Sequence, residues 1–197
     1  PGQVIPSSRN QLIQAPEGGV LNELRVKEGD VVKKDQLLAT FEKAKAEAGF
    51  LESASKVASL RAAVARLRAE VLGGTPQWPR EVAGHRAIVD SQQQLFAKRQ
   101  AAIREEVASL ERSLALVKEE LEMNLPLLKT GDVSRAEILK LQRQVSDVQA
   151  QITNRRNNYF QESQADLVKA EEELASALQQ LTQRREVLGY TEVRSPM

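Results

Sequence analysis

The sequence has no cysteine, one histidine and almost no net charge. Without cysteine it has no disulfide framework, thiolate zinc site or cysteine nucleophile, and one histidine cannot build a histidine-rich metal site. Its 28 Lys and Arg residues stand against 27 Asp and Glu residues, so no strong field attracts nucleic acid or an anionic membrane. No glycine-rich phosphate loop, nucleophile elbow or HExxH motif occurs. We therefore expect no enzymatic activity, no cofactor and no nucleic-acid partner.

The sequence also lacks long apolar runs and has few aromatic residues. No apolar run reaches the roughly 20 residues of a bilayer-spanning helix, and the first residues lack the basic and apolar regions of a signal peptide. Aromatic residues make up 4% of the 197 residues, which is few for a compact core, whereas Ala, Leu, Val, Glu, Gln, Arg and Lys dominate long stretches. This composition is typical of long helices packed side by side.

Residues 1–42 have the pattern of short strands and turns. Apolar and polar residues alternate from Val20 to Val26 with one slip, which predicts a half-buried strand. A turn signal follows at 28–30, and strand character resumes at 36–41. About 42 residues of short strands cannot bury a stable core alone, so a later segment must complete this sheet.

From residue 43 to 188 the apolar residues recur with helical spacing. We expect three helices, at about 43–72, 80–129 and 134–188. The first carries apolar residues seven apart, at Phe50, Val57, Val64 and Val71. It stops in the segment Gly73-Gly74-Thr75-Pro76-Gln77-Trp78-Pro79, because glycine lowers helix propensity and proline lacks the amide that a continuing helix donates.

An apolar seam with four-three spacing runs along the second helix. It consists of Ile103, Val107, Leu110, Leu114, Val117, Leu121, Asn124 and Leu128. We expect Asn124 to fix the register of this seam at a cost in stability. Upstream, adjacent apolar pairs recur every seven residues, at Ile88-Val89, Leu95-Phe96 and Ala102-Ile103. This doubled stripe predicts a wider buried face, and hence two neighbouring helices in place of one.

The third helix begins with a capping box, Ser134-Arg135-Ala136-Glu137. In this motif the serine hydroxyl accepts from the Glu137 amide, and the glutamate carboxylate accepts from the Ser134 amide. Just before it, Gly131 can take the left-handed conformation that follows a helix end. Residues 130–133 are therefore expected to be a tight connection between helices. The seam continues at Ile138, Leu141, Val145, Val148 and Ile152 and, after an eight-residue step, at Phe160, Leu167, Leu174, Leu181 and Leu188.

Helix lengths constrain how the three helices pack. At 1.5 Å per residue the second and third helices span roughly 75 and 80 Å, so they match as an antiparallel hairpin, whereas the first spans roughly 45 Å. The first helix cannot extend the second end to end, so the linker at 73–79 must run backward beside it. We expect a three-helix section near the strands that narrows to a two-helix coiled coil toward residues 130–133.

The pattern changes once more after the third helix. Gly189 ends it, and residues 190–194 alternate like a strand. This is the partner that the early strands require. The predicted fold is therefore mainly α with a small β module: a long antiparallel coiled-coil hairpin of three helices, at 43–188, is inserted in a split β module made of 1–42 and 189–197.

Sequence motifs flank the helical region on both sides. Before it stand Ala15-Pro16-Glu17-Gly18-Gly19-Val20 and the segment 26–38, which begins Val26-Lys27-Glu28-Gly29-Asp30; after it stands Val193-Arg194-Ser195-Pro196. They are similar to the two halves of a lipoyl or biotinyl domain. With the hairpin between them, the chain resembles the periplasmic adaptors called membrane fusion proteins, most closely the hemolysin D type of type I secretion systems.

The resemblance implies several features of the β module. Residues 1–6 would begin a strand of the family's β-barrel, and residues 189–197 would begin the second lipoyl half. Lys43 lies near the position of a carrier domain's modified lysine, but the Asp-Lys hairpin tip of such a domain is missing. No lipoyl or biotinyl group is therefore expected.

The resemblance also implies that the hairpin tip docks on a TolC-type outer-membrane channel. The family's tip pattern is an Arg, a Leu four residues later and a Ser seven beyond that; Leu127 and Ser134 fit it, but Met123 occupies the Arg position. Pro126 removes a helical amide one turn before the tip, and we expect it to bend or fray the second helix. The implied channel-binding residues are Leu127, Thr130, Gly131, Asp132, Val133, Ser134 and Arg135.

The implied function is to link an inner-membrane ABC transporter to that channel for the export of a secreted protein. Several copies, six by family analogy, would associate in a ring. The protein would be periplasmic in a Gram-negative bacterium, anchored in the inner membrane through a segment absent from this chain. Two alternatives stay open: an adaptor of a tripartite drug-efflux pump, and a plain coiled-coil scaffold, which pairing of residues 20–26 with 190–194 would exclude.

Overall fold

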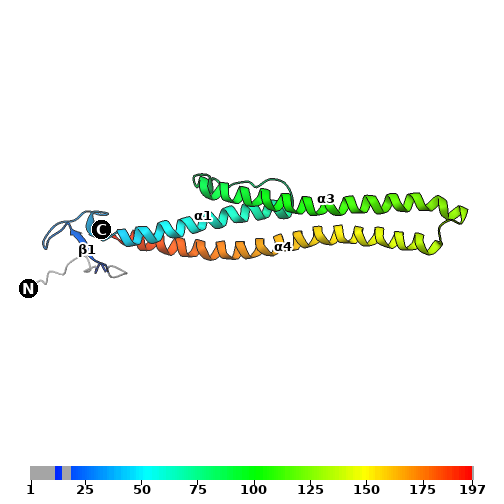
Figure 1. Ribbon diagram of the computed structural model, residues 1–197. Helices are drawn as coiled ribbons and strands as arrows, with labels where there is room; N and C mark the ends of the chain where they lie inside the picture. Colours follow the sequence, from blue (N-terminus) through cyan, green and yellow to red (C-terminus); the bar gives the residue numbers. More distant parts are fainter. Residues whose placement is uncertain (1–11, 15–18, 197) are drawn as a thin grey trace, which may run out of the picture. The chain divides into compact units, whose positions relative to one another are not determined.

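The computed structural model describes residues 12–14 and 19–196 (Figure 1). The predicted barrel strand at 1–6 and the motif residues 15–18 lie outside this part of the chain. In order, the elements are β1 (Leu21–Leu24), β2 (Leu37–Phe41), α1 (Ala44–Leu72), α2 (Arg80–Ala83), α3 (Arg86–Thr130), α4 (Arg135–Gly189) and β3 (Glu192–Arg194). The chain divides into two compact units, one made of 1–56 and 176–197 and the other of 57–175.

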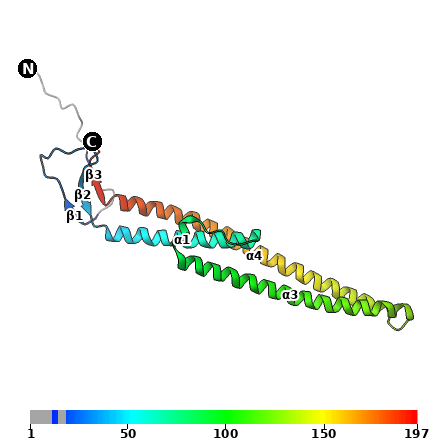
Figure 2. The ribbon, with the colours of Figure 1, turned by 90° about the horizontal axis from the view of Figure 1, so that it is seen from above.

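The first unit contains a three-stranded antiparallel sheet in the order β1-β2-β3 (Figure 2). Leu24 pairs with Ala39 on one side of β2, and Val193 pairs with Ala39 on the other. The strand after the long helices therefore joins the strand before them, which confirms the split sheet expected from the sequence. The sheet partner of β3 is β2, however, and not the strand within residues 20–26.

The prediction that the first strand is half-buried is wrong. All four residues of β1 are exposed, whereas the central residue of β2, Ala39, is buried. β1 is an edge strand, and no helix or strand among the described residues covers either of its faces. Alternation of apolar residues marks the faces of a strand, but burial requires a second layer.

An ion pair connects the end of the sheet to the start of α1. Lys43 Nζ lies 2.5 Å from Glu192 Oε1, and Arg194 Nη2 lies 2.9 Å from Glu192 Oε2. The hydrogen bond from Lys43, followed by that from Arg194, lowers the pKa of the Glu192 carboxyl below its ordinary value. Lys43 is thus engaged as an ion-pair partner of the strand that follows the helices.

In the second unit, α3 and α4 lie side by side and antiparallel (Figure 1). One apolar cluster joins them, made of Ile103, Val107, Leu114 and Ile152, with Leu110, Val145, Val148 and Tyr159 packed against it. A second cluster joins α1 to α4 and consists of Val64, Leu67, Leu167 and Ala170, with Val71 and Leu174. The three-helix section and the two-helix coiled coil expected from helix lengths are both present.

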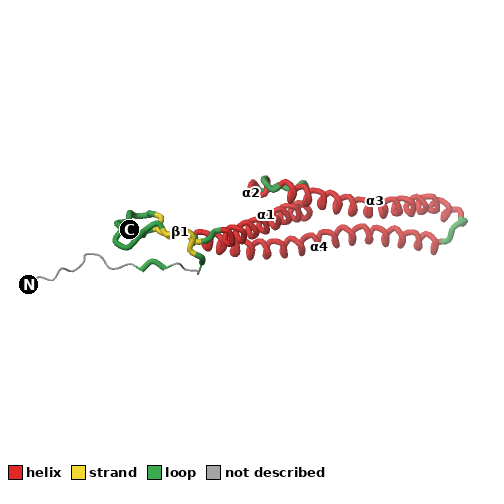
Figure 3. Tube along the Cα trace, turned by 60° about the vertical axis from the view of Figure 1, so that its left-hand side comes forward, coloured by secondary structure: helices red, strands yellow, loops and turns green. Residues whose placement is uncertain are grey.

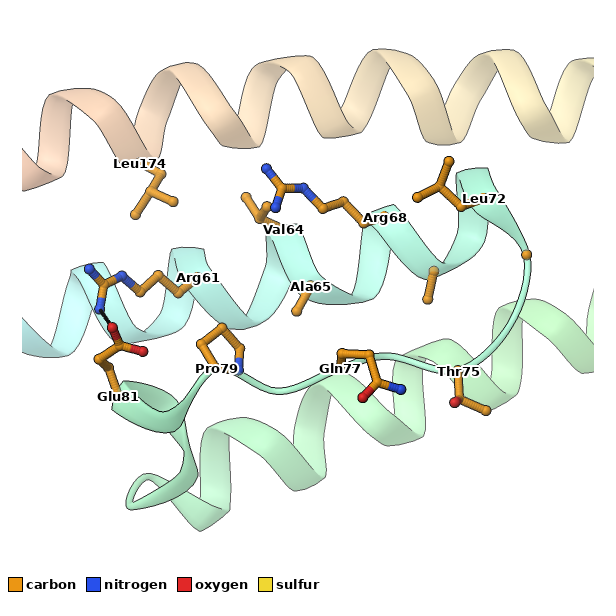
Figure 4. Close-up of a pocket in the computed structure, with 12 residues that line it drawn as sticks. Arg61, Val64, Ala65, Arg68, Leu72, Thr75, Gln77, Pro79, Glu81 and Leu174 are labelled. Carbon is orange, nitrogen blue, oxygen red and sulfur yellow. Dashed lines mark ion pairs between the residues drawn. The ribbon is translucent and has the colours of Figure 1, made fainter.

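The linker between α1 and α3 runs back along α1, as the length argument requires (Figure 4). Arg61 Nη1 lies 3.3 Å from Glu81 Oε1, so the linker has returned about 11 residues, or roughly 16 Å, along α1 by the time it reaches α2. A groove of about 540 Å³ lies between α1, the linker and Leu174. Val82, which is fully buried, anchors this return.

The prediction of one continuous helix over 80–129 is wrong at its start. The four-residue α2 ends at Gly84, and α3 begins after His85, whose φ of −98° and ψ of 65° are not helical (Figure 3). α2 places Val82 in the core. The residues Gly84 and His85 separate α2 from α3, so the two helices are not continuous. Helical periodicity alone carries no signal for this tertiary contact.

The seam of α4 also differs from the predicted one. Phe160 is 49% exposed, and Tyr159 takes its place, seven residues after Ile152. The Tyr159 hydroxyl accepts a hydrogen bond of 3.0 Å from Gln100 Nε2, and the guanidinium of Arg99 lies 5.8 Å from the ring centroid. Burial is the main cause that raises the pKa of Tyr159. A tyrosine is favoured at this position because its polar end has partners there.

Two smaller expectations about α3 need correction, although this part of the helix does contact both α1 and α4, as the doubled stripe predicts. Leu95 and Ala102 are exposed while Phe96 and Ile103 are buried, so at those two heptads the doubled stripe has a single buried member. Asn124 does not reach across the seam: its Nδ2 donates to the Glu120 carbonyl at 2.7 Å within the same helix. Its amide is satisfied locally, which leaves register to other residues.

Candidate functional site

α3 ends in a left-handed glycine cap. Gly131 has a φ of 85°, and its amide donates to the Leu127 carbonyl. The same carbonyl accepts from the amides of Asp132 at 3.0 Å and Val133 at 3.4 Å. The Thr130 hydroxyl lies 3.0 Å from that carbonyl and 2.5 Å from Asp132 Oδ2. The chain thus reverses direction around one carbonyl oxygen.

α4 starts with the serine cap that the sequence predicts. Ser134 Oγ accepts from the Glu137 amide at 3.2 Å. The Glu137 carboxylate pairs with Lys140 Nζ at 3.8 Å. The serine half of the capping box is therefore confirmed, while the glutamate is engaged by a lysine. Together the two caps make a tight turn at the end of the hairpin, because each satisfies backbone groups that the adjoining helix leaves free.

The candidate site is this hairpin tip, made of the seven residues expected to bind a channel. Six of them are exposed, and Val133 is half-buried. The residues are Leu127, Thr130, Gly131, Asp132, Val133, Ser134 and Arg135. The turn therefore brings together the residues that the sequence singled out, and presents them to solvent.

Exposed apolar side chains extend the tip surface beyond those seven residues. Met123 is 62% exposed, and Leu125 and Leu139 are exposed too. Sequence reasoning considered Met123 only as a departure from a pattern and missed the two leucines. The signal was available, because both leucines lie off the four-three seam on which the other apolar residues stand. A large apolar residue outside the seam has no place in the hairpin core.

Of the two effects expected of Pro126, bending or fraying of the helix, fraying does not occur. α3 continues through it to Thr130. A proline removes one helical amide, and the following turn is closed by the group of donors on the Leu127 carbonyl. The tip is therefore held in a defined conformation on the end of a continuous helix.

Ion pairs connect α3 and α4 beside the seam. Arg156 Nη2 lies 2.8 Å from Glu111 Oε1, and Arg155 pairs with Glu106. The hydrogen bond from Arg155 lowers the pKa of Glu106 below its ordinary value, and the same bond raises the pKa of Arg155. These pairs are largely exposed, so they add little stability but disfavour alternative alignments of the two helices.

No grouping of three or more His, Cys, Asp or Glu residues suited to a metal ion occurs within residues 12–14 and 19–196. In the same described part of the chain, no helix combines the length and the apolar character needed to cross a bilayer.

Comparison with known proteins identifies the fold. The soluble domain of LipC, a membrane fusion protein of a type I secretion system, matches with a TM-score of 0.71 and 22% sequence identity, covering 96% of this chain and 90% of that one. The periplasmic adaptor protein EmrA matches with a TM-score of 0.43 and 19% identity, over 90% of this chain and 60% of that one. No protein-family model matches the sequence, and no curated protein matches it. The chain has the fold of a membrane fusion protein.

Proposed function

We propose that this chain is part of a periplasmic adaptor that connects an inner-membrane ABC transporter to a TolC-type outer-membrane channel in type I protein secretion. The likeness to the LipC soluble domain over nearly the whole of both chains carries the proposal. The function is mechanical and needs no catalytic group: a hairpin bridges the space between two membrane proteins. An inner-membrane anchor outside this chain would hold the adaptor in the periplasm.

The hairpin tip is the surface proposed to bind the channel. Its turn is held by two helix caps, so little conformational entropy is lost when a partner docks. Leu127 and the neighbouring Met123 and Leu125 expose apolar surface there, which supports a contact made mainly by burial of apolar area. Met123, at the family's Arg position, supplies apolar surface in place of a guanidinium.

Copies of the chain are proposed to associate in a ring, six by family analogy, so that their tips meet the channel together and enclose a path for the secreted protein. Each tip then contributes a weak contact, and the linked copies bind much more tightly than one alone. The pairing of β2 with β3 supports an adaptor over a plain coiled-coil scaffold, because a scaffold made only of helices needs no sheet formed by the strands on either side of them.

Site-directed cross-linking tests tip docking directly. These 197 residues contain no cysteine, so Thr130→Cys or Asp132→Cys carries a single thiol in a full-length protein in which any cysteine outside this segment is replaced by serine. In cells treated with a reagent that joins a thiol to a nearby lysine amine, each variant is expected to form a cross-linked product with the outer-membrane channel. Lys169→Cys, exposed on α4, is the matched control and should give none. Absence of product at both tip positions, with the protein expressed and exported to the periplasm, contradicts the proposal.

Deletion of the gene separates secretion from drug efflux. A secretion adaptor is required for a particular protein to reach the medium, and its loss leaves drug sensitivity unchanged. An efflux adaptor gives the reverse result. Measuring the secreted proteins and the growth inhibition by a panel of drugs in the same strain distinguishes the two.

A further inference from the structure

Beyond the end of α1, the described part of the hairpin consists of α3 and α4 alone (Figure 1). Near that end, the buried Glu70 carboxylate pairs with Arg66 of α1 and Arg99 of α3. It also accepts a hydrogen bond from Ser163, so α1 reaches α4 as far as this residue. From this level to the tip, α3 and α4 pack on each other along one seam. Within the described part of one copy, the other sides of both helices have no neighbour there.

On this outer surface, α3 carries a line of exposed, uncharged residues spaced seven apart. Each directly precedes a residue of the seam, as Ala102 precedes Ile103, and therefore is not part of the hairpin core. Leu116 is 67% exposed, and Met123 is exposed too. The line, here called the α3 line, consists of Ala102, Ser109, Leu116 and Met123.

α4 carries a corresponding line, on which each residue directly follows a residue of the seam, as Thr153 follows Ile152. Leu139 and Phe160 are large exposed side chains. The hydroxyls of Ser146 and Thr153 donate at 3.1 Å to carbonyls of their own helix, so they need no outside partner. This α4 line consists of Leu139, Ser146, Thr153 and Phe160. None of the eight residues in the two lines is charged, although 28% of the chain is, and an exposed apolar surface of this kind marks an interaction site.

The two lines lie on opposite faces of the hairpin. One residue turns about 100° around a helix axis, so one step back from the seam on α3 and one step forward on α4 both lead away from it. Because the helices are antiparallel, these two steps turn in the same sense when both helices are viewed along one direction. Two helices that face each other and turn in the same sense end up facing opposite ways. The α3 line is therefore on one face and the α4 line on the other.

The lines are also level with each other along the hairpin. Glu106 of α3 pairs with Arg155 of α4, so Ser109, three residues nearer the tip, is level with residue 152 of α4 and next to Thr153. Seven residues toward the tip on both helices lead to the same level again. Each member of the α3 line therefore has a level counterpart on the α4 line. The counterparts are Ala102 and Phe160, Ser109 and Thr153, Leu116 and Ser146, and Met123 and Leu139.

We propose that the α3 line of one copy packs against the α4 line of the next copy, and that this contact joins the copies of the proposed ring. The inference rests on the proposed function and identifies the two faces through which copies associate. Contacts between unlike faces close into rings, and copies related by rotation alone stand at one level. Each residue then meets its counterpart, and large side chains meet small ones, as closely packed surfaces require. Phe160 lies against Ala102 of the next copy, and Leu116 against Ser146.

Charges beside the lines are complementary in this contact. Glu120 lies one turn nearer the tip than Leu116, and Arg143 lies one turn nearer the tip than Ser146. The two charges of neighbouring copies therefore meet at one edge of the contact. Neither has an ion-pair partner within the described part of its own chain. No like charges meet further along this edge, where the facing pairs are Ser113 with Ala150 and Glu106 with Asn157. Opposite charges at matching positions select the correct partner face.

Disulfide trapping in the full-length protein tests the contact. These 197 residues contain no cysteine, and any cysteine outside them is replaced by serine. Ser109 and Thr153 are exposed and close to cysteine in size, so S109C/T153C is expected to fold. Its two thiols point to opposite faces of one hairpin, out of reach of a disulfide within the chain. Oxidation in cells should therefore link successive copies into a ladder of multimers.

The two single variants are the matched controls. S109C alone or T153C alone puts a thiol on one face only, and like faces do not meet, so each should give about tenfold less linked product than S109C/T153C. Cells that contain both single variants should form dimers and nothing larger, because each copy has one thiol. The proposal is wrong if the double variant forms no ladder, or if either single variant dimerises as well as the mixture does.

Charge reversal provides a second test in the S109C/T153C protein. E120R or R143E alone should lower the yield of multimers about threefold, because like charges then meet at the edge of the contact. The combination E120R/R143E restores the attraction and should restore the yield. Yields that respond to neither reversal, or a combination no better than the single reversals, overturn the proposal.

The cross-link between the T130C tip and the channel separates this inference from the proposed function. If the tip still cross-links to the channel while S109C/T153C forms no ladder, the two faces are wrong and the adaptor function stands. If neither product forms, with the protein present in the periplasm, both are wrong.

Discussion

Replacing Gly131 by alanine tests the turn on which the tip depends. Gly131 has a φ of 85°, and a Cβ built there meets nothing within 4 Å. The cost of alanine is therefore conformational, not steric. A left-handed backbone costs a non-glycine residue about 1–2 kcal/mol, which exceeds the gain from a less flexible unfolded chain. We expect G131A to lower the free energy of unfolding by about 1 kcal/mol.

Gly84 provides the matched control. It also ends a helix, and a Cβ there also meets nothing within 4 Å, but its φ is −72°. Alanine fits that backbone, so G84A should raise the free energy of unfolding by about 0.4–1 kcal/mol. The two identical substitutions are thus expected to differ by roughly 1.5–2 kcal/mol in opposite directions.

Urea unfolding followed by far-UV circular dichroism measures both effects on the same transition. G131N should lose less stability than G131A, because asparagine adopts the left-handed conformation more readily. If G131A and G84A shift the midpoint equally, the left-handed glycine is not what ends α3, and the account of the tip is wrong.

Three further predictions test the seam, the cap and the ion pair by the same unfolding assay. Leu167→Ala should cost about 2–5 kcal/mol because it leaves a cavity against α1, whereas Phe160→Ala should cost less than 1 kcal/mol because that ring is half-exposed; equal losses would contradict the observed seam. Ser134→Ala should lower the free energy of unfolding by about 0.5–2 kcal/mol, because it removes the acceptor of the Glu137 amide, and Ser134→Asp should retain most of the stability. If Ser134→Ala leaves the stability unchanged, Ser134 does not cap α4. The hydrogen bond from Lys43 lowers the pKa of Glu192. The ionised Glu192 therefore stabilises the folded state above the ordinary pKa of 4.5, and this stabilisation is lost as the pH falls through the lower pKa of the folded protein. E192Q should therefore flatten the acid side of the stability profile, and an unchanged profile would refute the ion pair.

Features set by local interactions could be predicted from the sequence. The helix end at Gly131 and the cap at Ser134 follow from backbone conformation and from a hydroxyl placed three residues before an amide. The heptad residues of α3, such as Ile103 and Val107, face the seam because a helix of fixed pitch brings them to one side. Each of these depends on a few neighbouring residues.

Features set by contacts between residues far apart in the sequence could not be predicted in this way. Whether Tyr159 or Phe160 enters the seam depends on Gln100 and Arg99, which lie about 60 residues away in the sequence and supply partners for a hydroxyl. The break at Gly84 depends on the burial of Val82. Both choices are close in local energy, and the packing environment decides between them.

The candidate site shows the same division. Its turn residues were predictable, because their motif is local. Its apolar extension, Leu125 and Leu139, has a signal in the sequence, because both residues lie off the four-three seam. That the two side chains are exposed is decided by the tertiary structure, because a second neighbouring helix could have covered them.

By itself, the amino-acid sequence determined the long helices, the tight turn between them and the strands on either side, since helical pitch, capping and strand alternation act between residues close along the chain. Tertiary structure alone decided that β2 lies between β1 and β3, that Tyr159 replaces Phe160 on the seam, and that Glu70 is shared by two arginines and a serine on three helices. The physical reason is that burial and the pairing of buried charges depend on which surfaces meet, and many surfaces of this repetitive sequence are alike.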